Sequence, residues 1–141
     1  MAGFELVFKV HESLYSVYRL KGIPDIACLS ASKDVLSLSI APNEITLICR
    51  SDLQVTGCEI DQASLTWRCL EVVSEHPADV VGLIAFVSHV LAGAGISLLT
   101  ISTFAGDLFF IKDESLVKAK DALSAAGNTI IQPAGLTRSR P

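Results

Sequence analysis

The spacing of apolar residues in the second half of the chain restricts its fold more than any other feature. Residues 80–92 and 114–126 each repeat apolar side chains at the helical period, so each is predicted to form a helix with one buried face. Between them lie two strand-length apolar runs, residues 96–103 and 108–112, joined by a Gly- and Asp-containing turn at residues 105–107. The second half therefore alternates strands and helices.

One further strand on either side completes this pattern. Residues 65–73 are predicted as the strand before the first helix, and residues 129–133 as an edge strand after the second. The resulting order, β-α-β-β-α-β, is the ferredoxin-like pattern. The uninterrupted apolar run at residues 96–103 is typical of a central strand buried on both faces, with residues 108–112 returning antiparallel to it.

Polar and glycine residues mark the predicted helix ends. Asp79 and Asp113 stand where side chains cap the first amides of a helix. Gly93 or Gly95 is predicted to end the first helix and Gly127 the second, because glycine readily adopts a left-handed backbone.

The first half repeats the same order in reduced form. Residues 4–8 and 14–20 are predicted as strands, and Asp25 as the cap of a short helix that continues to about Ser32. Residues 35–40 and 45–50 are predicted as a hairpin around a turn that contains Pro and Asn. The helix that would follow this hairpin is missing or replaced.

These patterns predict an α+β fold of two ferredoxin-like modules in tandem, each an antiparallel sheet with helices on one face. The predicted division is a shortened module at residues 1–57, a full module at 58–133 and a flexible tail at 134–141. The uncovered sheet face must bury against a sister module or another subunit. Half of the residues are hydrophobic, which also favours self-association as a homo-oligomer such as a homodimer.

Composition argues against several classes of function. The net charge is −4 and the basic residues are scattered, which disfavours nucleic-acid binding. The longest apolar stretch, residues 80–91, is too short to cross a bilayer, and the start of the chain lacks a signal-peptide pattern. The four cysteines have no zinc-like spacing. We therefore expect a cytoplasmic protein with reduced thiols, no metal and no cofactor.

The second half also resembles a known family. Residues 95–127, GISLLTISTFAGDLFFIKDESLVKAKDALSAAG, are similar to the signature of small two-module ACT proteins, a group that includes the modules of CASTOR-type arginine sensors. The resemblance is strongest over residues 67–127 and looser before Ser51, and it covers nearly the whole chain. It implies a regulatory protein that senses a small molecule, usually an amino acid, and is not itself an enzyme.

The resemblance also implies a ligand position, between modules and near the loop that precedes the first helix of the full module. The family often carries Phe-Ser-Leu-Thr-Gly there, whereas this chain lacks the hydroxyls and has a carboxylate. The residues carried over as ligand-binding are Ala78, Asp79, Val80, Val81 and Gly82 in that loop, and Ser102, Thr103, Phe104 and Asp107 around the end of the facing strand.

The chemistry of these residues suits a zwitterion. Amides at the helix start, at Val80, Val81 and Gly82, can bind a carboxylate. Asp107 or Asp79 can bind an ammonium group through a charge-assisted hydrogen bond.

Other interpretations use the same residues. Asp79 can simply cap the helix and Asp107 can simply shape a turn. A small enzyme of the cyclase or isomerase type could use His76 with Asp79 or Asp107 as acid and base. A third possibility is an assembly module that binds no ligand.

Overall fold

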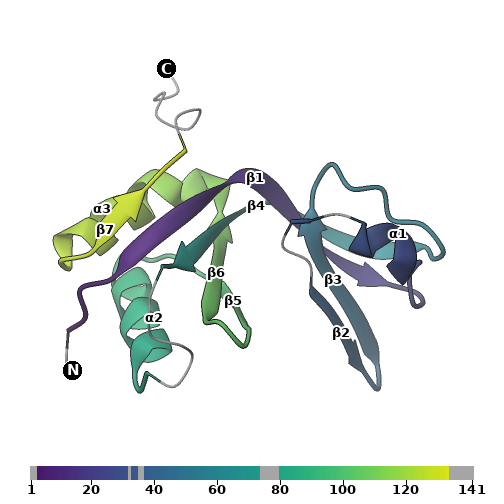
Figure 1. The fold of residues 1–141 in the computed structure, drawn as a ribbon, viewed down its shortest axis with the longest axis horizontal. Coiled ribbons are helices and arrows are strands. Elements are labelled where there is room, and N and C mark those ends of the chain that lie inside the picture. The colour runs from purple at the N-terminus through teal and green to yellow at the C-terminus, as the bar shows by residue number, and fades with distance from the viewer. Residues whose placement is uncertain (1–2, 32, 35–36, 74–79, 134–141) are drawn as a thin grey trace. The chain divides into compact units, whose positions relative to one another are not determined.

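The computed structural model describes residues 3–31, 33–34, 37–73 and 80–133 (Figure 1). The chain divides into two compact units, which are described separately below. The large unit consists of Met1–Glu12 and Arg68–Pro141, and the small unit is Ser13–Trp67. Two long strands, β1 (Val7–Leu20) and β4 (Ile60–Val72), each contribute residues to both units.

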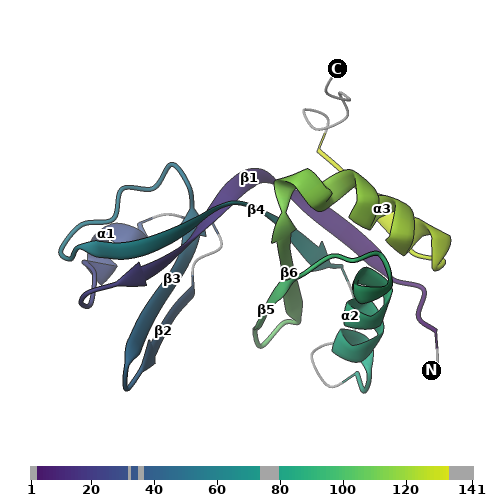
Figure 2. The same cartoon turned by 180° about the vertical axis from the view of Figure 1, so that it is seen from behind.

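The large unit confirms the predicted order of strands and helices. After β4 come α2 (Leu83–Gly93), β5 (Leu99–Ser102), β6 (Asp107–Lys112), a 3-10 turn η1 (Asp113–Ser115), α3 (Leu116–Ala125) and β7 (Thr129–Ile131). The strand order in this unit is β7-β1-β4-β6-β5. Both helices cover one face of the sheet (Figures 1 and 2). The fold is thus an antiparallel ferredoxin-like sheet, to which the first strand of the chain adds one parallel pairing with β7.

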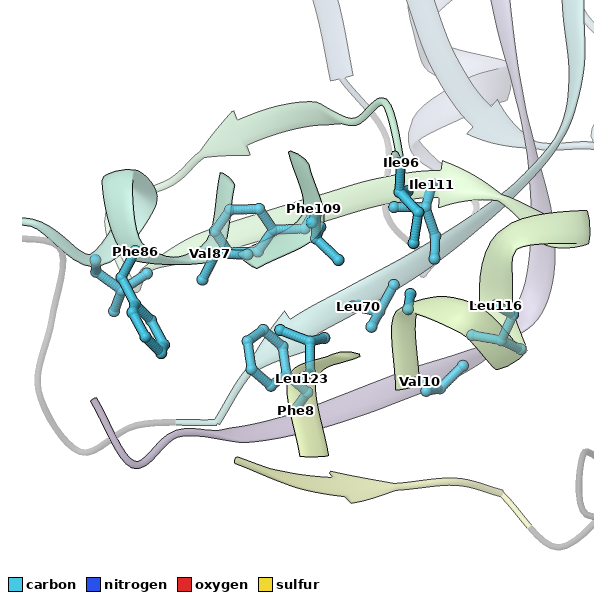
Figure 3. Packing of buried hydrophobic residues seen from close by; sticks show 13 residues of the cluster. Phe8, Val10, Leu70, Phe86, Val87, Ile96, Phe109, Ile111, Leu116 and Leu123 are labelled. Carbon is cyan, nitrogen blue, oxygen red and sulfur yellow. The ribbon is translucent and has the colours of Figure 1, made fainter. Parts of the chain in front are cut away.

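The core of the large unit lies between the sheet and its two helices (Figure 3). Alternate residues of the strands, such as Phe8 and Val10 in β1, point to the helices, as the twofold period of a strand requires. The rings of Phe8 and Phe109 meet edge to face with centroids 6.4 Å apart. The buried core residues are Phe8, Val10, Leu70, Leu83, Phe86, Val87, Leu91, Ile96, Phe109, Ile111, Leu116, Ala119 and Leu123.

The prediction that residues 96–103 form a central strand is wrong. Only Leu99–Ser102 is a strand, it lies at the edge of the sheet, and its side chains alternate between half-buried and exposed. The preceding Ile96 and Leu98 instead pack into the core on the way from α2 to the sheet. Those apolar residues lengthen the run without belonging to a strand. The neighbouring strand β6 is the interior strand, paired with β5 on one side and with β4 on the other.

A buried ion pair ties the large unit together where β1 and β4 leave it. The Nε atom of Arg68 donates to Asp113 Oδ1 at 2.7 Å, and Arg68 Nη1 donates to the carbonyl of Glu12 at 2.8 Å. The side chains of Arg68 and Asp113 are only 8% and 13% exposed. The prediction that Asp113 caps the last helix is wrong, because Asp113 is the first residue of η1 and no described side chain caps η1 or α3. Its carboxylate instead pairs with the buried guanidinium.

The small unit contains the ends of β1 and β4 together with α1 (Ile26–Ser30), β2 (Ser37–Ala41) and β3 (Glu44–Arg50). Its strand order is β2-β3-β1-β4. The β2–β3 hairpin is confirmed, with Ala41 opposite Glu44. Its core includes Leu20, Leu29, Leu47 and Cys49.

Of two predictions about the first half of the chain, one is confirmed and the other is wrong. The Asp25 cap is confirmed, because its carboxylate accepts from the amides of Ala27 at 3.1 Å and Cys28 at 3.3 Å. The two strands predicted at residues 4–8 and 14–20 are instead a single strand, β1. Pairing of β1 with β4, in addition to β7 at one end and β3 at the other, keeps the residues between the two predicted strands extended.

The predicted modules, residues 1–57 and 58–133, do not follow the two compact units. The first residues of the chain pack with the large unit, and β4 begins in the small one. The division into tandem modules therefore stays a prediction, and the predicted tail at 134–141 lies outside the described residues.

Candidate functional site

The site begins at the first turn of α2. Gly82 precedes the helix with φ of 91°, a left-handed conformation that glycine adopts without strain. The amide of Phe86 donates to the carbonyl of Gly82 at 2.9 Å and forms the first helical hydrogen bond. The helix thus starts at Leu83, later than the predicted Val80, because the left-handed Gly82 interrupts the helical backbone. The predicted cap, Asp79, lies outside the described residues.

The first amides of α2 are available to a ligand. The N-cap position is a glycine, and in the described part of the chain no side chain caps this helix. The first turn also contains no acidic residue. Such amides carry the positive end of the helix dipole and bind anions.

A buried carboxylate lies at the other side of the site. Asp107, the first residue of β6, is directly opposite Ser102 of β5, and Ser102 Oγ donates to Asp107 Oδ1 at 2.7 Å. Asp107 is only 9% exposed. Its second oxygen, Oδ2, has no hydrogen-bond partner among the residues that the structure describes. This oxygen is therefore able to accept a hydrogen bond from a bound ligand.

These two features line one pocket. Figure 1 shows the start of α2 and the β5–β6 turn at the same end of the large unit. The pocket has a volume of about 290 Å³ and is mainly apolar in its described lining, with one ionisable side chain, Asp107. The described lining residues are Val80, Gly82, Leu83, Ile84, Ala85, Ser102 and Asp107.

The pocket brings together part of the predicted site. Among the predicted ligand-binding residues, Val80, Gly82, Ser102 and Asp107 line it. Ala78 and Asp79, like His76 of the enzymatic alternative, lie outside the described residues.

Three predicted site residues do not line the pocket. Val81 is 93% exposed and Phe104 is completely exposed. Thr103 Oγ1 donates to the carbonyl of Gly106 at 3.0 Å and so stabilises the turn between β5 and β6.

Sequence reasoning missed the first-turn residues Leu83, Ile84 and Ala85, which do line the pocket. The signal that could have found them is Gly82. Interpreted as a left-handed N-cap, it would have moved the predicted helix start to Leu83.

The described residues offer neither a membrane-spanning helix nor a metal site. No helix among them is long and apolar enough to cross a membrane. No group of three or more His, Cys, Asp and Glu side chains among them could hold a metal ion.

Comparison with known proteins agrees with this fold. The ACT domain family matches residues 62–125, which run from β4 through α3. The whole chain shares its fold with a protein of Agobacterium tumefaciens (TM-score 0.79, 22% identity, 93% of this chain and 96% of that one). No curated protein matches the chain in sequence.

Two further structures are similar. One is the regulatory subunit of aspartate kinase from Thermus thermophilus in its ligand-free form (TM-score 0.63, 13% identity, 84% of this chain and 95% of that one). The other is a possible transport protein from Vibrio cholerae (TM-score 0.62, 21% identity, 87% of this chain and 91% of that one). The large unit thus has the fold of ACT domains.

Proposed function

We propose that this chain is a regulatory protein that binds an amino acid in the pocket at the start of α2. The observation that carries the proposal is Asp107, a buried carboxylate with an oxygen that lacks a partner in the described chain, across a pocket from uncapped helix amides. The match of residues 62–125 to the ACT domain family supports it. So does the likeness of the fold to a regulatory subunit of aspartate kinase.

The pocket offers one complement to each charged group of an amino acid. The ligand carboxylate accepts hydrogen bonds from the first amides of α2, where the helix dipole also favours a negative charge. The ligand ammonium donates to Asp107 Oδ2 in a charge-assisted hydrogen bond. The ligand side chain then lies against Leu83, Ile84 and Val80.

Regulation follows from differential binding. A ligand that bridges the α2 start and the β5–β6 turn stabilises the conformation in which these two elements are close. In a homo-oligomer of tandem ACT modules, or in a complex with a partner protein, that preference changes the stability of one assembly relative to another.

Thermal unfolding of the full chain tests the proposal. Each of the twenty amino acids is added in turn at millimolar concentration, and at least one is expected to raise the melting temperature. A ligand at 100 times its Kd adds about 2.7 kcal/mol of stability.

Two variants connect this effect to the pocket. Asp107→Asn should abolish the rise while the melting temperature without ligand stays close to that of the unchanged chain. Asp121→Asn, an exposed carboxylate on α3, is the matched control and should keep the rise. The absence of a shift with every amino acid would exclude the proposed function.

A further inference from the structure

We infer that residues 3–6 form a strap that holds the start of α2 in place, with Phe4 as its positioning residue. This inference rests on the proposed function only where it concerns the pocket, because the contacts between the strap and α2 lie within the chain itself. It adds a residue, Phe4, that is not among the described residues lining the pocket.

The first turn of α2 lacks the local contacts that usually fix the start of a helix. Its N-cap is Gly82, in a left-handed conformation, and no described side chain caps it. A second local device is the hydrophobic staple, in which the residue before the N-cap packs against the fourth residue of the helix. In α2 these residues are Val81 and Phe86, and Val81 is 93% exposed, so the local staple is not made. The start of α2 therefore depends on contacts from elsewhere in the chain.

The ring of Phe4 supplies this contact. Its centroid lies 5.3 Å from the ring centroid of Phe86, with the two ring planes inclined by 54°, a separation that aromatic pairs prefer. The same ring lies against Gly82, because a Cβ atom on that glycine would be 3.9 Å from Phe4 Cζ. Phe4 therefore contacts both residues of the first α2 hydrogen bond, in which the Phe86 amide donates to the Gly82 carbonyl at 2.9 Å. It acts as a hydrophobic staple that comes from a distant part of the sequence.

The other end of the strap is bonded to the connection between α3 and β7. The amide of Leu6 donates to Asn128 Oδ1 at 2.9 Å, and the amide of Thr129 donates to the carbonyl of Leu6 at 2.9 Å. Asn128 is itself buried, and its Nδ2 atom donates to the carbonyl of Leu123 at 3.0 Å. These bonds fix Leu6, so the nearby Phe4 ring is held beside α2, where Figures 1 and 2 show the segment before β1.

The strap acts on the pocket through the first turn of α2. Gly82 and Leu83 both line the pocket, and Phe4 packs against the first of them. A glycine has more backbone conformations available than any other residue, so loss of the Phe4 ring lets Gly82 leave its left-handed conformation more often. A site that is formed for a smaller fraction of the time binds its ligand more weakly. The strap therefore raises the affinity of the pocket without contacting the ligand.

Hydrogen exchange of the full chain, followed for single amides by NMR, tests the strap. In Phe4→Ala the Phe86 amide should exchange at least about tenfold faster than in the unchanged chain, while the Leu123 amide of α3 changes by less than about threefold. Phe4→Leu keeps an apolar side chain, so its exchange rate at Phe86 should lie between the two. Val117→Ala, which removes an apolar side chain that is 69% exposed on α3, is the control and should leave the Phe86 amide unchanged.

Two results of the exchange experiment would overturn the inference. Equal acceleration at Phe86 and Leu123 would mean that Phe4 contributes only to the general stability of the large unit. No acceleration at Phe86 would mean that the ring does not hold the start of α2.

The thermal screen with the twenty amino acids, repeated on Phe4→Ala, relates the strap to the pocket. The rise in melting temperature given by the best amino acid should become smaller than in the unchanged chain, and an unchanged rise would overturn the link between strap and pocket. If no amino acid raises the melting temperature of the unchanged chain, the proposed function fails, whereas the exchange rates still decide whether the strap positions α2.

Discussion

The two units begin their first helices in different ways. In the small unit, α1 is capped from within the chain, because the Asp25 carboxylate accepts from the amides of Ala27 and Cys28. In the large unit, α2 begins at Gly82, and no described side chain caps it. The same β-α-β-β order can therefore have the first helix amides bonded by a side chain of the protein itself, or leave these amides able to bind an external anion.

The hairpins that follow show the same contrast. In the small unit, Glu44 begins β3 on the exposed surface, and its Oε1 accepts from Thr46 at 2.6 Å. At the corresponding place in the large unit, Asp107 begins β6 and is buried. Only the large unit therefore combines an open helix start with a buried acid.

The largest effect that we expect concerns the ion pairs of the two units. Arg68→Ala removes the guanidinium that bonds the buried Asp113 and the carbonyl of Glu12. It should lower the free energy of unfolding of the large unit by about 3–5 kcal/mol. Arg19→Ala breaks a more exposed pair with Asp61 in the small unit and should cost at most about 1 kcal/mol. Urea unfolding followed by circular dichroism measures both. Equal costs would show that burial does not distinguish the two pairs.

A smaller effect separates two left-handed glycines. Gly57 has φ of 85°, and a Cβ atom there would lie 2.8 Å from the amide nitrogen of Asp25. Gly57→Ala should therefore destabilise the small unit by about 2–3 kcal/mol. Gly82 has φ of 91°, but no atom of the described residues lies closer than 3.9 Å to such a Cβ, so Gly82→Ala should lower the free energy of unfolding by about 1 kcal/mol. Chemical unfolding of both variants measures the two losses of stability. A larger loss for Gly82→Ala than for Gly57→Ala would contradict the prediction.

The smallest effect is a pH dependence of the α1 cap. Hydrogen bonds from the Cys28 thiol and amide, and from the Ala27 amide, lower the pKa of Asp25 from its usual 3.8. A lowered pKa means that the cap stabilises the folded state above pH 3.8 and that this stabilisation is lost as the pH falls through the folded value. Asp25→Ala should therefore reduce stability at pH 7 and make progressively less difference below pH 3.8.

Unfolding curves of both proteins from pH 7 downward check this dependence. Asp25→Asn is the control, because its amide oxygen can accept the bonds from the Ala27 and Cys28 amides without titrating. A loss of stability in Asp25→Ala that stays constant with pH would contradict the assignment.

Features set by neighbouring residues could be predicted from the sequence. The α3 helix, the β2–β3 hairpin and the Asp25 cap all depend on contacts within a few positions, and periodicity and turn composition report these contacts directly. The proximity of Asp107 to the start of α2 was expected from the resemblance to ACT proteins. The pocket itself was expected only in part.

Features set by distant residues could not be predicted. The extent of β1 depends on pairing with β3 and β7, and the edge position of β5 depends on which strand β6 joins. The true start of α2 was missed because capping statistics favour an Asp such as Asp79 over a left-handed glycine. Nothing in the order of residues indicated that one oxygen of Asp107 would lack a donor in the described chain.

The pairing of β1 with β7 has a consequence for how the protein is made. Val7 lies beside Thr129, and the amide of Leu6 donates to Asn128 Oδ1 across 122 positions of the sequence. During translation, residues 13–67 of the small unit emerge from the ribosome together, whereas the β1 residues of the large unit gain this neighbour only after residues 129–131 have emerged. Long-range pairings of this kind slow folding, so the contact between β1 and β7 is expected to form late in the folding of the large unit.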